Sequence, residues 1–328
     1  MNKTASFLIT FTAAVLGALS LSGCKEKPAA TNSLKPFQIL LDWQPEPTYL
    51  GVYYAREKGY YRDLGLDVEI VPSGGANQAV AAVAGGKYAI ATASGGATVL
   101  GYNNGADCVS LAVLYPRVPT AVFGLSDKKL TAPQDLIGKK VGIYPGSINV
   151  NEFDAFVKAN NVDKSQLTVV SISGSDVALL RSGQIDFALN YWEMSPTIMD
   201  VDPQLSQVDG RRTSFLKLAD HGVRGYGVNV ITSRDTLAKQ GDLVRQVAAA
   251  MVRGYAEAKK NPDDAAAVFC RLFPDRDPAY VKESLRRVNE MLGSPAGAQD
   301  AEGWQQTIDS YHSLGLLKVK PSPAQILP

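Results

Sequence analysis

The stretch from Leu40 to Gly75 constrains the fold of this chain more than any other, because it reads as a strand, a helix and a second strand. The first apolar run, Phe37–Leu41, is cut off by a turn with two prolines, and proline cannot donate to a sheet ladder. Leu50–Lys58 is typical of a helix that stops at a glycine, and Leu66–Val71 is rich in branched apolar residues. The connection between the two runs is long enough for a parallel crossover, so this stretch predicts an α/β fold.

Three candidate ligand-binding residues follow the first of these strands. In open α/β sheets, ligands bind beyond the carboxyl ends of the strands, and Asp42, Trp43 and Tyr49 occupy that position. A carboxylate and two aromatic rings in this place predict a flat polar ligand.

Strands and helices alternate through the rest of the chain, apart from a polar segment up to Arg212 that we interpret as irregular. Two passages rich in proline or glycine divide the pattern into two α/β units. We expect lobe 1 to combine residues 36–122 with residues 227–328, and lobe 2 to span residues 123–226. Two lobes on a hinge produce a cleft that can close on a solute.

The first 23 residues read as an export signal, because a positive start is followed by a short apolar stretch. The run Leu21-Ser22-Gly23-Cys24 resembles the lipobox of bacterial lipoproteins, which implies cleavage before Cys24 and a lipid on that cysteine. An ordinary signal peptide with an incidental cysteine is the alternative. Residues 24–35 are a polar tether. We expect a protein in the periplasm, bound to the membrane only through the lipid, or at the outer side of the cytoplasmic membrane where no outer membrane exists.

The composition gives no sign of nucleic acid, metal or cofactor binding. Basic and acidic residues nearly cancel, 33 against 32, so no basic field attracts a polyanion. His221 and His312 stand alone, and no cysteine and histidine spacing suits a metal. Cys108 and Cys270 lie in apolar segments, which favours two buried free thiols, with a disulfide as the alternative in an oxidising compartment.

Several motifs resemble those of the solute-binding proteins of ABC importers: Leu41-Asp42-Trp43 with Pro45, Glu57-Lys58-Gly59-Tyr60, Gly65-Leu66-Asp67-Val68, Leu136–Gly142 and Gly222–Gly227. The subgroup is the one that handles the pyrimidine precursor of thiamine, together with the related thiamine-pyrimidine synthase. The resemblance spans nearly the whole mature chain, and sulfonate, nitrate, taurine and flavin binders share much of this framework.

The resemblance implies a type II periplasmic-binding-protein fold, with a hinge of two crossover segments and a central ligand cleft. It also implies a monomer that delivers its solute to a membrane permease. The ATPase would be a separate subunit, because this chain contains no GxxxxGKS/T phosphate loop.

The strand that ends near residue 190 is followed by a second set of candidates, Asn190, Tyr191, Trp192 and Glu193. Trp43 could stack on a ring, with Tyr191 or Trp192 of the other lobe on the opposite face. Only one of these two neighbours can easily face the cleft, and either could be lobe core. Asp42 and Glu193 could accept hydrogen bonds from a ring amino group, although Asp42 could equally serve a turn.

Three glycine-containing turns add candidates, because each precedes a helix and frees backbone N–H groups for a ligand oxygen. They are Ser73-Gly74-Gly75, Ser94-Gly95-Gly96 and Gly146-Ser147, of which Ser94-Gly95 and Gly146-Ser147 are the better candidates. Plain helix capping is the alternative for all three. Tyr115 and Tyr226 lie near the crossings, where they could reach the ligand or pack in the hinge.

The synthase branch of the resemblance is catalytic, and it carries a histidine in the turn after the tryptophan and a CCCFC iron motif. Here Tyr49 stands where that histidine would be, and the sequence contains no cysteine cluster. Neither lone histidine has an evident partner for acid–base chemistry, and no nucleophile elbow is present. We therefore expect a binding protein and not an enzyme, with a thiamine pyrimidine synthase-like enzyme as a distant alternative.

Within the binding class, the residues favour a small heteroaromatic solute such as a hydroxymethyl- or formylamino-pyrimidine. Arg117 and Arg224 leave an alkanesulfonate, taurine or nitrate ligand open, although carboxylates at the cleft would repel such an anion. Tyr49 and the Tyr53-Tyr54 pair resemble the riboflavin-binding branch, which is a further alternative. A purely structural lipoprotein is the alternative outside transport.

Overall fold

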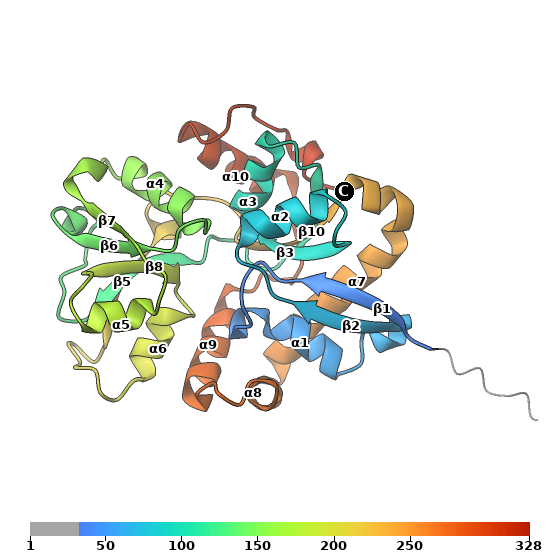
Figure 1. The fold of residues 1–328 in the computed structure, drawn as a ribbon, viewed down its shortest axis with the longest axis horizontal. Helices are drawn as coiled ribbons and strands as arrows, with labels where there is room; N and C mark the ends of the chain where they lie inside the picture. The colour runs from blue at the N-terminus through green and yellow to red at the C-terminus, as the bar shows by residue number, and fades with distance from the viewer. Residues whose placement is uncertain (1–32) are drawn as a thin grey trace, which may run out of the picture. The chain divides into compact units, whose positions relative to one another are not determined.

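Two five-stranded sheets, one in each lobe, organise residues 33–328, the part of the chain that the computed structural model describes (Figure 1). The predicted signal peptide, the lipidation site Cys24 and most of the predicted tether lie outside these residues. No helix among residues 33–328 is long and apolar enough to cross a membrane. Cys108 and Cys270 are both free thiols, the first buried and the second partly buried.

The sheet of lobe 1 has the strand order β2-β1-β3-β10-β4. β1 pairs in parallel with β2 and β3, whereas β10 is antiparallel to both of its neighbours. β3 and β10 are buried along their whole length, as expected for central strands with helices on both faces. The strands are β1 (Lys35–Leu40), β2 (Leu66–Val71), β3 (Ile90–Ser94), β4 (Cys108–Val113) and β10 (Val228–Ser233).

One face of this sheet is covered by α1, α7, α8 and α9, and the other by α2, α3 and α10. α1 and α7 approach so closely that a Cβ atom at Gly254 would lie 2.0 Å from the carbonyl oxygen of Gly51, which explains the glycine. The helices are α1 (Leu50–Glu57), α2 (Ala76–Ala84), α3 (Gly95–Asn103), α7 (Arg234–Lys260), α8 (Pro262–Leu272), α9 (Pro278–Met291) and α10 (Ala301–Ser313).

The sheet of lobe 2 has the order β7-β6-β8-β5-β9, with β6 parallel to β7 and β8, and β5 antiparallel to β8 and β9. Its strands are β5 (Thr120–Leu125), β6 (Lys140–Ile143), β7 (Thr168–Ser171), β8 (Phe187–Tyr191) and β9 (Thr213–Lys217). Its helices are α4 (Asn149–Ala159), α5 (Asp176–Arg181) and α6 (Ser195–Val201).

Helix α6 corrects the prediction that the polar segment before Arg212 is irregular. Pro196 stands in its first turn, where the missing N–H is not needed, and Met199 is fully buried against the sheet. The helix has only seven residues, too few for its periodicity to stand out in the sequence.

The two sheets share one topology. In each, three parallel strands are followed by an antiparallel strand and then by an edge strand. The antiparallel strand is always the first one after a crossing, β5 in lobe 2 and β10 in lobe 1. By this correspondence, β6 occupies in lobe 2 the place that β1 occupies in lobe 1.

The chain crosses between the lobes at residues 114–119 and again at residues 218–227. The expected boundary after residue 122 falls inside β5, which pairs with β8 and β9 from Thr120 onward, so lobe 2 begins earlier than predicted. The crossings are joined where the N–H of Gly227 donates to the carbonyl of Tyr115, at 2.8 Å.

Candidate ligand-binding cleft

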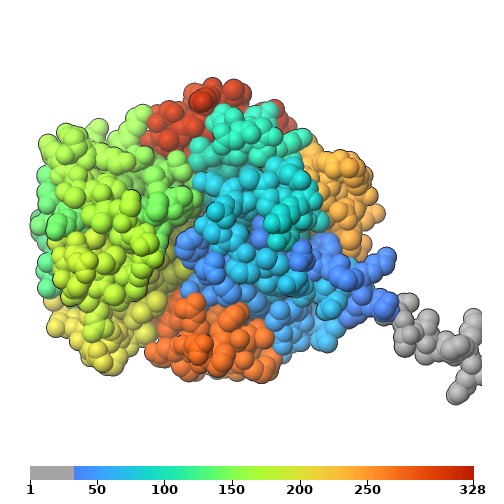
Figure 2. Space-filling model, in the orientation of Figure 1, coloured from blue at the N-terminus to red at the C-terminus, as the bar shows by residue number. Residues whose placement is uncertain are grey.

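A cavity of about 320 Å³ lies between the lobes. In the space-filling view, the lobes meet where the green surface of lobe 2 borders the blue and cyan surface of lobe 1 (Figure 2). Lobe 1 contributes the loop after β1, the start of α2 and the start of α9, through Asp42, Trp43, Glu46, Tyr49, Gly75, Ala76, Arg276 and Tyr280. Lobe 2 contributes the loop after β6, the starts of α4 and α5, the end of β8, and α6, through Tyr144, Ser147, Ile148, Asn149, Ser175, Asp176, Asn190, Tyr191, Met194, Ser195 and Ile198.

Aromatic rings from both lobes line this cavity. Trp43 follows β1 and is partly buried, and its ring meets the edge of Tyr144, which follows β6, with 6.2 Å between the ring centroids. The Tyr144 hydroxyl donates to the carbonyl of Gly174 at 2.7 Å, which fixes the ring in place. Tyr191, at the end of β8, adds a third ring. A planar guest would therefore find stacking surfaces on both lobes.

Asp42 is a buried carboxylate on the lobe 1 side of the cavity, only 4% exposed. Its Oδ1 accepts a hydrogen bond from Thr92 Oγ1 at 2.5 Å, and its own N–H donates to the same hydroxyl oxygen. Burial raises the pKa of Asp42, while hydrogen bonds from Thr92 and Tyr49 oppose that rise.

Asp176, at the start of α5, is the matching carboxylate of lobe 2, and it is 3% exposed. Its Oδ2 accepts hydrogen bonds from Ser195 Oγ at 2.7 Å and from Asn190 Nδ2 at 3.1 Å. Burial raises the pKa of Asp176, and these two donors lower it. Ser195 and Asn190 also line the cavity, and their hydrogen bonds to Asp176 fix the orientation of their side chains there.

Glu46 differs from the other two carboxylates, because both of its oxygens have strong partners. Oε1 accepts from Arg276 Nη2 at 2.7 Å and Oε2 accepts from the Tyr280 hydroxyl at 2.9 Å. Burial raises the pKa of Glu46, and the guanidinium beside it lowers it. Among the described residues, this is the one ion pair that reaches the cavity lining. Within residues 33–328, neither Asp42 nor Asp176 forms an ion pair, and the lining residue Arg276 is paired with Glu46.

Several predicted site residues line the cavity, namely Asp42, Trp43, Tyr49, Ser147, Asn190 and Tyr191. They come from both lobes and from segments far apart in the chain. Of the Tyr191-Trp192 pair, Tyr191 faces the cavity.

Trp192 and Glu193 do not line the cavity. The Trp192 ring packs instead against Lys217, whose Nζ lies 3.5 Å from the ring centroid. Glu193 is fully buried, and its Oε1 accepts from Thr48 Oγ1 of lobe 1 at 2.9 Å. Burial raises the pKa of Glu193 to about 8, although Thr48 and Arg287 lower it. β8 ends at Tyr191, so Trp192 and Glu193 lie in the turn between β8 and α6.

Ser94, Gly95 and Tyr115 do not line the cavity and contact other parts of the protein instead. Ser94 caps α3 by accepting from the N–H of Ala97, and a Cβ at Gly95 would lie 2.4 Å from the carbonyl oxygen of Tyr226. The Tyr115 hydroxyl donates to the carbonyl of Thr48 at 3.1 Å. These residues pack behind the cavity or in the hinge.

Tyr226 and Gly146 also lie outside the lining. The Tyr226 hydroxyl accepts from the N–H of Asp300 at 3.1 Å, which ties the second crossing to α10. Gly146 has a φ of 76°, a backbone conformation that glycine adopts without strain, so its role is to shape the turn before Ser147.

The sequence analysis missed several lining residues. Tyr144 had a usable signal, because it ends a strand of lobe 2 as Trp43 ends one of lobe 1. Ser195 and Met194 belong to the unpredicted α6 and its N-cap. Arg276 and Tyr280 come from the C-terminal helices, and no local pattern in the sequence connects them to β1.

The chain is similar in sequence to several known proteins. The sequence profile of the family described as NMT1/THI5 like matches residues 46–265. The chain is 27% identical over 308 residues to the formylaminopyrimidine-binding protein of Halalkalibacterium halodurans, with 90% of each chain covered. It is 25% identical to the riboflavin-binding protein RibY of Chloroflexus aurantiacus, over 88% of this chain and 84% of that protein. It is 23% identical to the 4-amino-5-hydroxymethyl-2-methylpyrimidine phosphate synthase of Legionella pneumophila, over 77% of this chain and 79% of that enzyme.

Solved structures establish the fold. The periplasmic aliphatic sulphonate binding protein SsuA of Escherichia coli superposes with a TM-score of 0.70 at 15% identity, over 90% of this chain and 92% of that one. The alkanesulfonate-binding protein SsuA of Xanthomonas axonopodis pv. citri, bound to MOPS, gives 0.67 at 17% identity, over 88% and 96%. The predicted two-lobed periplasmic-binding-protein fold is confirmed.

Proposed function

Since the chain belongs to the NMT1/THI5-like family, we propose that it is the solute-binding component of an ABC importer and that its cleft captures a small aminopyrimidine. The observation that carries this proposal is the combination of two buried carboxylates, Asp42 and Asp176, which form no ion pair among the described residues, with aromatic rings on both lobes. Carboxylates accept hydrogen bonds from ring amino groups, and the rings accept the flat face of a heterocycle.

The charge of the cleft argues against a sulfonate or a nitrate. The two arginines that kept this alternative open lie elsewhere: Arg117 pairs with Asp220 at 2.7 Å between the crossings, and Arg224 borders a groove beside α10. Arg276 does line the cavity, but Glu46 neutralises it. An anion entering here would meet buried carboxylates without a free cation to compensate it.

The size of the cavity favours one ring over an isoalloxazine with its ribityl chain. About 320 Å³ is near the lower end of the roughly 300–1,000 Å³ of small-molecule pockets. The similarity to a riboflavin-binding protein keeps that vitamin as the second candidate.

Transport fits the residues better than catalysis does. Tyr49 occupies the cavity position where the synthase resemblance places a histidine, and His221 instead packs its ring edge-on against Phe156 at 6.0 Å. Lobe closure around the pyrimidine and docking on a permease then form the functional cycle. In this proposal, the lipid on Cys24 holds a monomeric protein at the outer side of the cytoplasmic membrane or in the periplasm.

A thermal-shift screen tests the proposal, because a ligand that binds only the folded state raises the melting temperature. The panel contains 4-amino-5-hydroxymethyl-2-methylpyrimidine, a formylaminopyrimidine, thiamine, riboflavin, taurine, an alkanesulfonate and nitrate. We expect the largest shift with an aminopyrimidine. A shift with riboflavin alone would favour the second candidate, and a shift only with the anions, or with none of these compounds, would overturn the proposal.

A further inference from the structure

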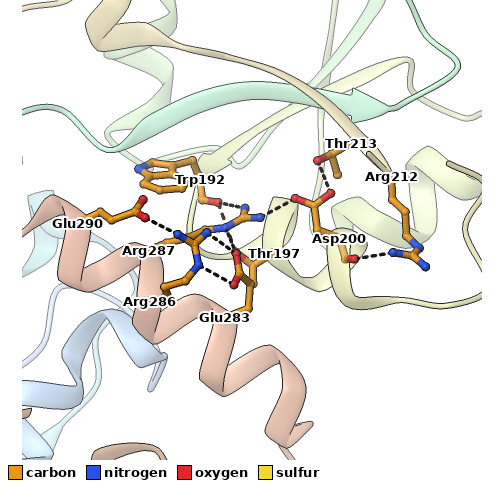
Figure 3. A network of polar contacts seen from close by, with 9 residues as sticks. All are labelled: Trp192, Thr197, Asp200, Arg212, Thr213, Glu283, Arg286, Arg287 and Glu290. Carbon is orange, nitrogen blue, oxygen red and sulfur yellow. Dashed lines mark hydrogen bonds and ion pairs between the residues drawn. The ribbon is translucent and has the colours of Figure 1, made fainter. Parts of the chain in front are cut away.

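Arg287, on α9 of lobe 1, is a buried cation that faces lobe 2. Its side chain is only 7% exposed, and its Nη1 donates to the carbonyl of Trp192 at 2.9 Å (Figure 3). Its Nη2 meets Asp200 Oδ2 at 2.6 Å, whereas its Nε donates to Glu283 Oε1 on its own helix. Two of the three contacts therefore join the lobes.

On the lobe 2 side, these contacts converge on α6. Asp200 belongs to this helix, and its Oδ1 accepts from Thr213 Oγ1 of β9 at 2.6 Å. Its carbonyl accepts from Arg212 Nη1 at 3.0 Å. Asp200 thus ties α6 to its own sheet with one carboxylate oxygen and to α9 of the other lobe with the second (Figure 3).

Helix α6 also forms part of the cavity wall. Ser195 and Ile198 lie on it and line the cavity, and Met194 caps its N-terminus and lines the cavity as well. Arg287 is not among the lining residues. An effect of this arginine on ligand binding is therefore indirect, either through α6, which it contacts, or through its own helix α9, which carries the lining residue Tyr280.

We propose that Arg287 is a positioning residue, which fixes α6 against α9 and so sets the affinity of the cleft without touching the ligand. The part of this inference that concerns affinity rests on the proposed binding function. A planar guanidinium can reach a carboxylate and a carbonyl at once, which an ammonium group cannot do with the same geometry. Removing one partner of a buried pair also leaves the other charge uncompensated.

The next residue along the helix provides a matched control. Arg286 is 56% exposed, and both of its carboxylate partners, Glu283 and Glu290, lie on α9 itself. Arg286→Ala therefore removes the same charge from the same helix without cutting a contact between the lobes.

Hydrogen exchange measured by mass spectrometry on the ligand-free protein tests the positioning role directly. In Arg287→Ala we expect the amides of α6, residues 195–201, to exchange about tenfold faster or more, because the helix loses its anchor on lobe 1. Arg286→Ala should leave α6 exchange unchanged. Unchanged α6 exchange in Arg287→Ala, or faster exchange confined to α9, would overturn the proposal.

Asp200→Asn provides a second variant in case Arg287→Ala does not fold, because it keeps the size of the side chain while weakening the same contact. It should raise α6 exchange in the same direction. An effect absent from both variants would contradict the proposal.

Calorimetric titration with 4-amino-5-hydroxymethyl-2-methylpyrimidine then measures the effect on affinity. We expect Arg287→Ala to raise Kd about tenfold or more, Arg287→Lys to raise it less, and Arg286→Ala to leave it unchanged. Adding Asp200→Asn to Arg287→Ala should cost less than the sum of the single changes, because both remove one contact. A lower melting temperature with an unchanged Kd would assign Arg287 a structural role only. If the wild-type protein does not bind the probe, the proposed ligand fails, whereas the exchange experiment still decides on Arg287.

Discussion

The candidate ligand cleft and the Arg287 contact lie between the same two lobes, but they differ in whether their buried charged groups form ion pairs. In the cleft, Asp42 and Asp176 are buried beside an open volume, and neither forms an ion pair in the part of the chain that the structure describes. At the Arg287 contact, the guanidinium has carboxylates on both sides and a carbonyl as well. Buried charge needs a partner. Arg287 has such partners within the chain. Under the proposed function, Asp42 and Asp176 would instead accept hydrogen bonds from the amino groups of the ligand.

Trp43→Ala should have the largest effect on the cleft side of this comparison. Losing the indole face removes a stacking surface at the centre of the site, so we expect Kd for the aminopyrimidine to rise about thirtyfold or more, equivalent to roughly 2 kcal/mol. Calorimetric titration measures this change. Trp43→Phe keeps a ring and should recover most of the affinity. Equal binding by wild type and Trp43→Ala would show that the guest does not stack there.

Asp42→Asn tests whether the unmatched carboxylate receives the ligand. A charged acceptor hydrogen bond is lost, so we expect Kd to rise about tenfold, or roughly 1.4 kcal/mol. Asp67→Asn, on the exposed side of β2, is the matched control and should bind like the wild type. If both variants bind as well as the wild type, Asp42 has only a structural role with Thr92. The contrast between the cleft and the Arg287 contact would then not depend on ligand binding by Asp42.

Glu193→Gln should change the pH dependence of stability and leave affinity nearly unchanged. Burial raises the pKa of Glu193 from 4.5 to about 8, so the folded protein keeps a proton that the unfolded chain releases. The stabilisation from this group is fully present below pH 4.5 and is lost as the pH rises through 8, with a slope of at most about 1.4 kcal/mol per pH unit.

Urea unfolding of wild type and Glu193→Gln across that pH range measures the difference. The wild type should lose stability relative to the variant as the pH rises. Glu152→Gln should behave in the same way up to about pH 7, because burial raises the pKa of Glu152 to about 7. Parallel stability curves for wild type and both variants would contradict the prediction.

Tyr226→Phe should have the smallest effect. It removes the hydroxyl that bonds to Asp300 in the hinge, so we expect a loss of about 1 kcal/mol in the free energy of unfolding. Affinity should not change, because Tyr226 lies outside the cavity lining. A rise in Kd would contradict this expectation and would mean that the hinge contributes to ligand binding as well as the cleft.

The sequence predicted what local patterns determine. Hydrophobic runs bounded by glycine and proline located most strands and long helices. Asp42 and Trp43, which were predicted from the turn after the first strand, line the cavity, and their contact with a ligand stays a prediction. Helix α6 was missed because it is short, and its first turn was hidden in a polar segment.

The opposite wall of the site was harder to predict, because it depends on which strands correspond between the lobes. The sequence predicted Tyr191 or Trp192 as the ring opposite Trp43 across a ligand, and Tyr191 does line the cavity. It missed Tyr144, which follows β6, the strand of lobe 2 that corresponds to β1, and whose ring lies against Trp43. Arg276 and Glu46 are 230 residues apart, and only the packing of α9 against lobe 1 brings them together.

The chain enters its fold at β1 and finishes at a 3₁₀ turn, Pro323–Gln325, and both belong to lobe 1. Lobe 2 is thus covalently attached only through the two crossings. Force applied at residues 33 and 328, the two ends of the part that the structure describes, would therefore load lobe 1 without passing through lobe 2.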